Sequence, residues 1–312
     1  MCKGKVFYWK KGADTPLNGR KTLEMILFKD PARLSGYFDT LKKSNIKIGF
    51  VPTMGALHAG HISLLEQSKK QTGITVCSIF INPTQFNDQK DFDKYPVTLE
   101  EDINKIEFAG TDILFLPDIG ALYENGTDNL EHYNIGYLET ILEGKFRPGH
   151  FQGVCQVMSR LLRIIRPDKL FMGQKDYQQS LVVDRLLTTL HLDTDLVVSP
   201  TFREANGLAM SSRNMRLSEG ERKKAGIIYE ALLYMRNKLR PGELSSLLNE
   251  TKSLLTEKGL RIDYVEIADA TSLKLADEWN GEQQLVALIA VFMGEVRLID
   301  NMIITGALNG VS

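Results

Sequence analysis

The feature that most constrains the fold is a regular alternation of strand-like and helix-like segments between residues 46 and 198. Short runs of β-branched or apolar residues predict strands at 46–51, 74–81, 112–116, 169–172 and 195–198. Apolar residues at helical spacing predict intervening helices at 61–70, 99–109, 152–165 and 176–190. Because strand, helix, strand alternation produces parallel pairing, the sequence predicts an α/β fold with a doubly wound, Rossmann-like parallel sheet.

The pattern changes after residue 201, which predicts a second domain. A helix rich in Lys and Arg is expected at 219–239, another ends near 259, and strands are expected at 263–267 and 284–292. We therefore expect a Rossmann-like domain at 25–200 and a smaller α+β domain at 201–312 that acts as a lid. Residues 1–24 are basic but lack the apolar run of a signal peptide, and we expect a flexible tail there.

Composition excludes several classes of protein. The net charge of −1, from 38 Lys+Arg and 39 Asp+Glu, offers no global attraction to nucleic acid or to an anionic membrane. The longest apolar stretch, 285–293, is far shorter than the roughly 20 residues of a membrane span. Three cysteines without close pairing favour a reducing compartment, so we expect a cytoplasmic protein.

The loop expected after the first of these strands, 52–61, carries the most unusual residues. His58 and His61 are three residues apart at the start of a predicted helix, beside free backbone N–H groups and the positive end of the helix dipole. This arrangement suits a nucleoside triphosphate, and Gly60 allows a ring of the nucleotide to approach the backbone. The alternative is that both histidines cap or pack the helix.

His-x-Gly-His resembles the signature of the nucleotidyltransferase superfamily, which by itself leaves class I aminoacyl-tRNA synthetases and adenylyltransferases open. Further motifs lie at 80–86, 93–96, 147–151, 173–179, 203–214 and 297–301. In this order, from about residue 25 to 304, they resemble the pantothenate synthetase family, the pantoate:β-alanine ligases. The resemblance implies ATP-dependent condensation of pantoate with β-alanine to pantothenate, a coenzyme A precursor, through pantoyl adenylate with release of AMP and pyrophosphate. It also implies a homodimer whose other partners are small-molecule substrates.

The resemblance also implies roles for particular residues. The implied catalytic residues are His58, His61, Lys175 and Arg213, with His61 as a proton donor. The implied ATP-binding residues are Met54, Gly55, Ala56, Leu57, His58, Ala59, Gly60, His61, Gly173, Gln174, Lys175, Asp176, Phe202, Met210, Ser211, Ser212 and Arg213. The implied pantoate and β-alanine ligands are Gln85 and Gln179, and the residues placed near the triphosphate and adenylate are Arg147 and His150.

Plainer interpretations stay open for some of these residues. Lys175 could be a solvated surface lysine and Asp176 a helix N-cap, whereas a lysine at the ligand end of a strand could meet a phosphate. Gln85 could stabilise a turn, and His150 could pack the start of a helix. Ser211 and Ser212 could be ordinary loop residues.

A metal site and two departures from the family pattern complete the expectations. Glu101 and Asp102 could hold the Mg²⁺ of Mg·ATP, or be a solvated pair in a first helical turn. Val97 stands where the family usually has Arg, and Phe202 where it has a smaller aliphatic residue, so both bear on nucleotide affinity. An adenylyltransferase, a tRNA-charging enzyme and a catalytically inactive nucleotide-binding protein are the alternative functions.

Overall fold

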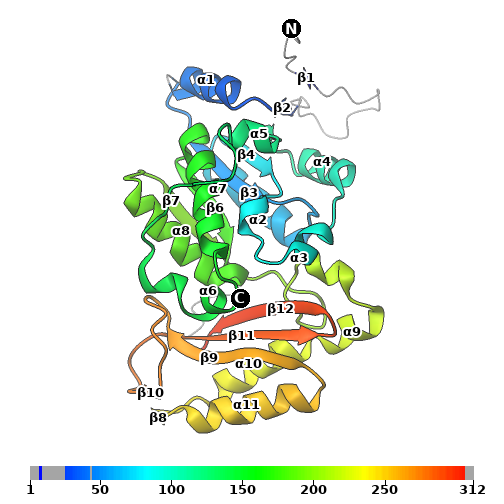
Figure 1. Ribbon diagram of the computed structural model, residues 1–312, viewed down its shortest axis with the longest axis vertical. Coiled ribbons are helices and arrows are strands. Elements are labelled where there is room, and N and C mark those ends of the chain that lie inside the picture. Colours follow the sequence, from blue (N-terminus) through cyan, green and yellow to red (C-terminus); the bar gives the residue numbers. More distant parts are fainter. Residues whose placement is uncertain (1–6, 9–24, 43, 306–312) are drawn as a thin grey trace. The chain divides into compact units, whose positions relative to one another are not determined.

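The computed structural model describes residues 7–8, 25–42 and 44–305, and it divides into two compact units (Figure 1). The first unit comprises Met1–Glu139, Arg147–Gly173 and Gln179–Ser199. The second unit comprises Thr140–Phe146, Gln174–Gln178 and Pro200–Ser312. Two short segments from within 25–200 thus group with the C-terminal part of the chain.

A parallel sheet forms the centre of the first unit. Among the described residues its strands follow the order β1-β2-β5-β4-β3-β6-β7. Neighbouring strands from β2 to β7 are all parallel, and β1 alone runs antiparallel to β2. The strands are β1 Phe7–Tyr8, β2 Ile26–Phe28, β3 Ile48–Thr53, β4 Ile74–Ile79, β5 Ile113–Phe115, β6 Lys169–Gly173 and β7 Asp195–Ser199. The predicted doubly wound parallel sheet is confirmed.

Helices connect these strands and bury their apolar faces on the sheet. Helix α2 packs against β3, β4 and β6, and α1 packs against α7. Burial along α7 includes polar side chains such as Gln156 and Ser159, so this helix is enclosed rather than half-exposed. The helices that begin in this unit are α1 Pro31–Lys42, α2 Ala59–Gln71, α3 Gln89–Asp93, α4 Leu99–Phe108, α5 Ile119–Leu122 and α7 His150–Ile165. Helix α8, Tyr177–Thr189, begins in the second unit and continues in the first.

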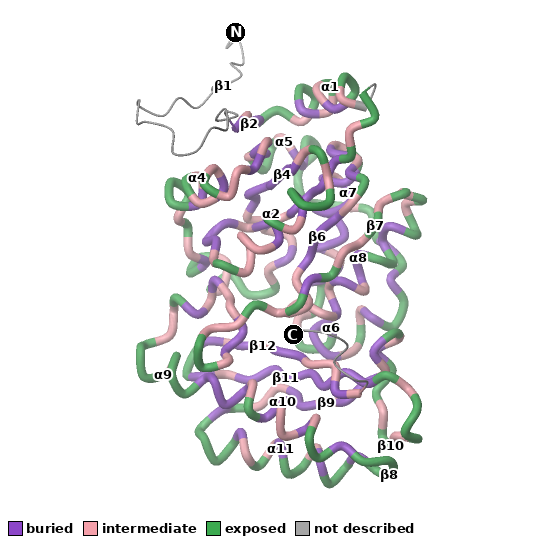
Figure 2. The backbone as a smooth tube through the Cα atoms, turned by 180° about the vertical axis from the view of Figure 1, so that it is seen from behind, coloured by how far each residue is buried: buried purple, intermediate pink, exposed green. Residues whose placement is uncertain are grey.

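The second unit is built on an antiparallel sheet in the order β12-β11-β9, which confirms the predicted α+β character. Its middle strand, β11, is buried along nearly its whole length, as Figure 2 shows, which explains the apolar run near the C-terminus. Helices α10 and α11 pack on one another and on this sheet. The elements are β9 Arg261–Asp269, β11 Leu285–Met293, β12 Val296–Ile303, α6 Leu142–Phe146, α9 Glu219–Lys224, α10 Ile227–Lys238 and α11 Ser245–Glu257, with a short pair β8 Gly242–Glu243 and β10 Glu278–Trp279.

Buried ion pairs explain why residues 140–146 belong to the second unit. The Arg297 guanidinium on β12 donates to both oxygens of Glu143, at 2.8 Å each, and to Asp263 Oδ2 at 2.6 Å. The Tyr264 hydroxyl also donates to Glu143 Oε1 at 2.9 Å. Because the Glu143 carboxylate is held by this guanidinium in a bidentate arrangement, α6 is held to the C-terminal sheet.

Some elements differ from the sequence prediction. The helix expected at 219–239 is two helices, α9 and α10, which are separated at Ala225 and Gly226. Gly226 lies against the Asn206 backbone there, where a Cβ would lie 2.6 Å from the carbonyl oxygen. No strand was expected at β12, because its polar residues interrupt the alternation of apolar and polar side chains that indicates a strand. The expected tail at 1–24 lies outside the described residues apart from Phe7–Tyr8, which pair with β2. In the part of the chain that the structure describes, no helix is long and apolar enough to cross a membrane.

Candidate active site

The loop between β3 and α2 has an unusual backbone. Gly55 and Ala56 both adopt left-handed conformations, with φ of 85° and 49°. This conformation is easy for glycine and uncommon for alanine, so the turn requires support from elsewhere in the fold.

Helix α4 supplies that support. Asp102, only 1% exposed, accepts the Ala56 N–H at 2.8 Å on one carboxylate oxygen and the Leu57 N–H at 2.7 Å on the other. Lys105, one turn further along α4, donates its Nζ to the Leu57 carbonyl at 3.0 Å. The peptide groups that precede His58 are therefore held on both sides.

The two histidines of the loop lie together at the start of α2. Their ring centroids are 4.1 Å apart, with the ring planes inclined by 35°. The His58 backbone N–H donates to His61 Nδ1 at 3.3 Å, which places the proton of a neutral His61 ring on Nε2. His61 thereby presents an N–H donor, which is the group that a phosphate oxygen requires.

The loop after β4 lies beside this first loop. Gln85, 9% exposed, ends a 3-10 turn at Pro83–Gln85, and its Nε2 donates to Met54 Sδ at 2.7 Å. Asn82 Nδ2 donates to Gln85 Oε1 at 3.2 Å, and the Tyr123 hydroxyl donates to Asn82 Oδ1 at 2.8 Å. The amide of Gln85 is thus oriented next to the histidine loop, as expected for loops at the carboxyl ends of neighbouring parallel strands.

The first turn of α7 supports the same loop. Arg147 Nη1 lies 3.2 Å from His150 Nε2, and because a guanidinium can only donate, that ring nitrogen accepts. His150 Nδ1 then donates to the Gln85 carbonyl oxygen at 2.8 Å. Gly153 lies so close to Thr84 that a Cβ would collide with the Thr84 carbonyl. His150 therefore packs the start of a helix and orients the Gln85 backbone at the same time.

In the second unit, the predicted residues Gln174, Lys175 and Asp176 form a 3-10 turn that is held by Asn301 on β12. Asn301 Nδ2 donates to the carbonyl oxygens of Gln174 and Lys175, at 2.9 and 2.8 Å. The Lys175 ammonium lies 3.1 Å from Asp176 Oδ1. Asp176 ends this turn and directly precedes the first residue of α8.

The segment that leads to Arg213 rests on a second buried pair. Arg203 donates to both oxygens of Asp300, at 2.6 and 3.1 Å, and its guanidinium lies 4.1 Å from the centroid of the Tyr229 ring. Burial raises the pKa of Asp300, and the hydrogen bonds from Arg203 oppose that rise. Residues 203 and 209 form a β-bridge, and Met210 N–H donates to the Phe202 carbonyl.

The predicted Ser211, Ser212 and Arg213 follow that bridge. The Ser211 hydroxyl accepts the Arg213 backbone N–H at 3.3 Å and so caps a 3-10 turn at Ser212–Arg216. Ser212 is buried and Arg213 is half-buried. The departures from the family pattern lie on the surface, with Val97 72% and Phe202 45% exposed, so their side chains do not build the core.

The predicted site residues thus divide between the two units. The first unit holds the 54–61 loop, Gly173, Gln85 and Gln179, of which Gln179 is half-buried on α8. The second unit holds residues 174–176, Phe202 and 210–213. Within the first unit, His58 and His61 lie together, and Gln85 contacts Met54 of the loop that carries them.

The two acidic residues of α4 are not arranged as a shared cation site. Both Asp102 oxygens accept backbone N–H groups, whereas the exposed Glu101 carboxylate pairs with Lys105 at 3.6 Å. Among the described residues, no group of three or more His, Cys, Asp or Glu side chains is placed to hold a metal ion. Because both Asp102 oxygens are occupied, this arrangement does not fit a resident Mg²⁺ held jointly by Glu101 and Asp102.

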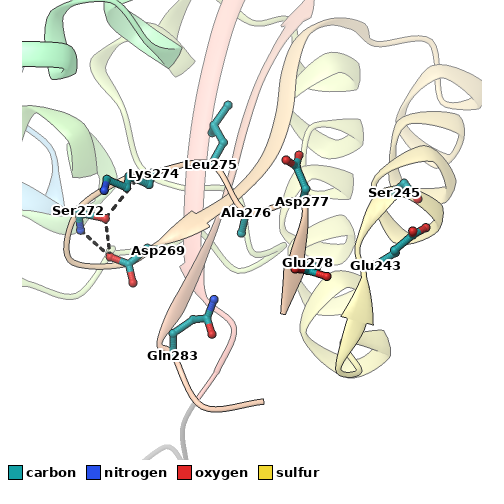
Figure 3. A pocket seen from close by; sticks show the side chains of 10 residues that line it. All are labelled: Glu243, Ser245, Asp269, Ser272, Lys274, Leu275, Ala276, Asp277, Glu278 and Gln283. Atoms are coloured by element: carbon teal, nitrogen blue, oxygen red, sulfur yellow. Dashed lines mark hydrogen bonds between the residues drawn. The ribbon is translucent and has the colours of Figure 1, made fainter. Parts of the chain in front are cut away.

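The second unit has a hollow of about 770 Å³ (Figure 3). Asp269, Asp277, Glu243 and Glu278 lie on its wall, with Lys274. The Asp269 carboxylate accepts Ser272 N–H and hydroxyl groups, at 2.7 Å each, so part of this acidic surface stabilises its own turn. None of the predicted ATP or substrate ligands lines the hollow.

Sequence reasoning missed the residues that hold the site in place. Asp102, Asn301 and His150 were each noted, but the hydrogen bonds they make to the loops were not expected. Asn82 and Asn301 were noted only as members of the motifs at 80–86 and 297–301, and Lys105 was not singled out. A polar residue in an otherwise apolar run, such as Asp300-Asn301 on β12, is the one local signal that could have revealed such a role.

A parallel α/β sheet with His-x-Gly-His at a strand-to-helix turn places the chain in the class of H-x-G-H α/β enzymes. The family model described as pantoate-beta-alanine ligase matches residues 26–303. A pantothenate synthetase from Bacteroides fragilis is 41% identical over 270 residues, covering 86% of this chain and 95% of that relative. One from Cytophaga hutchinsonii is 43% identical over 266 residues, covering 84% and 93%.

Solved structures agree. The pantothenate synthetase of Thermus thermophilus matches with a TM-score of 0.80 and 36% identity, covering 90% of this chain and 99% of that one. The pantoate-beta-alanine ligase of Francisella tularensis, complexed with beta-gamma ATP and beta-alanine, matches with a TM-score of 0.75 and 36% identity, with the same coverage. The chain belongs to the pantoate–β-alanine ligase family, and it is a ligase that forms an amide bond.

Proposed function

We propose that this chain makes pantothenate from pantoate, β-alanine and ATP in two steps. In the first, a pantoate carboxylate oxygen attacks the α-phosphorus of ATP, the bond from that phosphorus to the β-phosphate oxygen breaks, and pyrophosphate leaves. In the second, the β-alanine amine attacks the acyl carbon of pantoyl adenylate, AMP leaves with the bonding oxygen, and the nitrogen loses a proton. Neither step requires a covalent bond to the protein.

In the first unit, the histidine loop binds the phosphates. The two rings lie at the start of α2, where the backbone N–H groups and the helix dipole favour negative charge. His61 Nε2–H donates to a phosphate oxygen as charge develops on the leaving pyrophosphate, and His58 supplies a second ring at the same place. Backbone of Gly55, Ala59 and Gly60 lets the nucleotide approach closely.

The acid substrates bind beside this loop through Gln85 and Gln179. Gln85 is oriented by Asn82 and by the His150 contact to its carbonyl, so its amide is held before the substrate arrives. An amide offers both a donor and an acceptor, which suits the hydroxyl and carboxylate groups of pantoate. The Francisella tularensis ligase complexed with beta-gamma ATP and beta-alanine supports binding of these two substrates.

In the second unit, Lys175 and Arg213 supply positive charge to the phosphates. Lys175 acts as a compact point charge, and Arg213 offers a fork of donors that matches phosphate oxygens. The hydroxyls of Ser211 and Ser212 and the backbone around Met210 and residues 173–174 contribute further contacts. Asp176 and Phe202 complete the predicted nucleotide ligands.

Mg²⁺ enters this proposal as part of the substrate Mg·ATP. A magnesium ion keeps several waters and is commonly held by substrate phosphates with few protein carboxylates, so the reaction needs no protein cage for it. The buried free thiols Cys77 and Cys155 suit a reducing compartment, which supports cytoplasmic location. The homodimer stays a prediction from the family resemblance.

The observation that carries this proposal is the contact between Gln85 and Met54. It places the residue proposed to bind pantoate next to the loop proposed to bind ATP. The test is to follow pyrophosphate and AMP from Mg·ATP with pantoate, with and without β-alanine. We expect a single turnover of pyrophosphate release with pantoate alone and steady AMP formation only when both acids are present. Pyrophosphate release that does not depend on pantoate would instead indicate an adenylyltransferase with a different acceptor.

A further inference from the structure

A buried carboxylate in α4 accepts hydrogen bonds from the backbone of the histidine loop and from the residue that precedes its own helix. Asp102 is 1% exposed, and its oxygens accept the Ala56 and Leu57 N–H groups at 2.8 and 2.7 Å. The Thr98 hydroxyl donates a third hydrogen bond to Asp102 Oδ2 at 3.2 Å. A buried charge is tolerated when it is hydrogen-bonded in this way, so these contacts are what allow Asp102 to lie there.

The loop itself has the geometry of an anion-binding concavity. Successive N–H groups beside left-handed residues converge on one point, and such an arrangement of amides binds anions. Gly55 and Ala56 are the left-handed residues, and the anion at the point of convergence is the Asp102 carboxylate. The Ala56 and Leu57 amides therefore face the protein interior.

Lys105 holds the other side of the same peptides. Its Nζ donates to the Leu57 carbonyl at 3.0 Å, so both polar groups of Leu57 are hydrogen-bonded to side chains of α4. Asp102 and Lys105 are three residues apart and lie on one face of the helix. His58 follows Leu57 directly, so the position of the first histidine depends on these bonds.

We propose that Asp102 is a positioning residue, an internal anion that holds the left-handed turn so that His58 and His61 face the phosphates of ATP. This inference rests on the proposed role of the histidine loop in binding ATP. Asp102 acts through the Ala56 and Leu57 amides and does not bind Mg²⁺. Lys105 assists it through the Leu57 carbonyl.

The test compares Asp102→Asn with Glu100→Gln, which removes an exposed carboxylate from the same turn of α4. Loss of a charge-assisted hydrogen bond predicts that kcat/KM for ATP falls about 10- to 100-fold in Asp102→Asn. Hydrogen exchange of the Ala56 and Leu57 amides in the ATP-free protein should quicken by a similar factor. The Mg²⁺ concentration at half-maximal rate should stay unchanged, and Glu100→Gln should match the parent in all three.

Two further variants keep the inference falsifiable. Lys105→Met removes the second anchor and leaves the Leu57 carbonyl without its side-chain donor, and it should quicken exchange at the same loop by a smaller factor. A raised Mg²⁺ requirement in both Asp102→Asn and Glu101→Gln, with unchanged exchange at Ala56 and Leu57, would overturn the inference in favour of a metal ligand. Unchanged exchange with an unchanged Mg²⁺ requirement would also overturn it. Because exchange is measured without substrate, failure of the proposed reaction would not alter this result.

Discussion

The two units hold their predicted phosphate-binding segments by opposite chemistry. In the first, a carboxylate, Asp102, accepts the backbone N–H groups of the histidine loop. In the second, an amide, Asn301, donates to the backbone carbonyls of the Lys175 turn. Each anchor is matched to the backbone groups that its turn presents.

The difference also concerns charge. A neutral amide fixes the Lys175 turn without adding a negative charge beside the ammonium group. The carboxylate at the histidine loop is directed at two N–H groups and lies beneath the loop, so its charge is satisfied before a phosphate arrives. In both units, the residues that anchor the turn thus differ from the residues predicted to bind the ligand.

The largest expected effect is a loss of catalytic rate when a ring of the histidine loop is removed. His61→Ala removes the Nε2–H donor, and loss of such a donor to developing charge lowers kcat by about 100- to 1,000-fold. The measurement is the rate of AMP formation with all three substrates present. His132→Ala, which removes an exposed histidine of the same unit, serves as the control and should retain the parent rate. A rate for His61→Ala within a few-fold of the parent would contradict the role given to this ring.

The next effect tests the amide anchor of the second unit. Asn301→Ala leaves the Gln174 and Lys175 carbonyls without their donor, and an unsatisfied buried group costs about 1–3 kcal/mol. We expect the apparent affinity for ATP to fall about tenfold or more, since about 1.4 kcal/mol corresponds to a factor of ten. ATP titration followed by calorimetry measures this directly.

The comparison for Asn301→Ala is Asn237→Ala, on the exposed side of α10. That variant should bind ATP as the parent does. Equal affinities for the two variants would show that the Lys175 turn does not need its anchor.

A smaller effect concerns the left-handed turn. Gly55→Ala forces a side chain into a backbone with φ of 85° and brings Cβ within 3.2 Å of Asp102 Oδ2. A left-handed conformation costs an alanine about 1–2 kcal/mol, so the free energy of unfolding should fall by about that amount. Gly36→Ala in α1, where nothing lies within 4 Å of the new Cβ, should raise it by about 0.5–1 kcal/mol. Urea unfolding of both variants checks the opposite signs.

The smallest effect is a difference between the two units in how their stability depends on pH. Burial raises the pKa of the Cys77 thiol from 9.0 to about 12, so between these values the folded protein binds more protons than the unfolded chain. The stability that depends on the protonated thiol is therefore fully present below pH 9. As pH rises, the free energy of unfolding falls by about 1 kcal/mol per such cysteine at about pH 10. In the second unit, burial beside Glu143 raises the pKa of Tyr264 well above 10.0. The stability that depends on its protonated hydroxyl is therefore lost at a higher pH than that of Cys77.

Urea unfolding at about pH 8 and about pH 10 measures this difference. Cys77→Ala should reduce the loss of stability between the two pH values, whereas Tyr264→Phe should change it much less. The Cys155 thiol, whose pKa burial also raises to about 12, accounts for part of the remaining loss in Cys77→Ala. An unchanged pH dependence in Cys77→Ala would contradict the assignment.

Much of the fold could be predicted because it is encoded locally. The apolar runs and helical periods between residues 46 and 198 predicted strands and helices whose ends differ from the observed ones by about two residues. The family and the reaction were predicted from the resemblance of the motifs. The roles of individual site residues stay predictions, although His58 and His61 do lie together and Gln85 contacts the loop that carries them.

The failures have a common cause, because each depends on residues distant along the chain. The break between α9 and α10 arises where Gly226 meets the Asn206 backbone. The pairing of Asp102 with the histidine loop spans 45 and 46 residues, and that of Asn301 with the Lys175 turn spans 126 and 127. Neither separation has a period that local patterning could detect.

The sequence by itself determined the parallel α/β sheet, the α+β character of the second unit and the loop on which His58 and His61 lie. Hydrophobic periodicity and loop position suffice for these, because both depend on neighbouring residues. Only the tertiary structure decided which polar groups each loop meets. A buried carboxylate or amide takes its role from the backbone donors and acceptors brought against it, so Asp102 and Asn301 became anchors only when the chain folded.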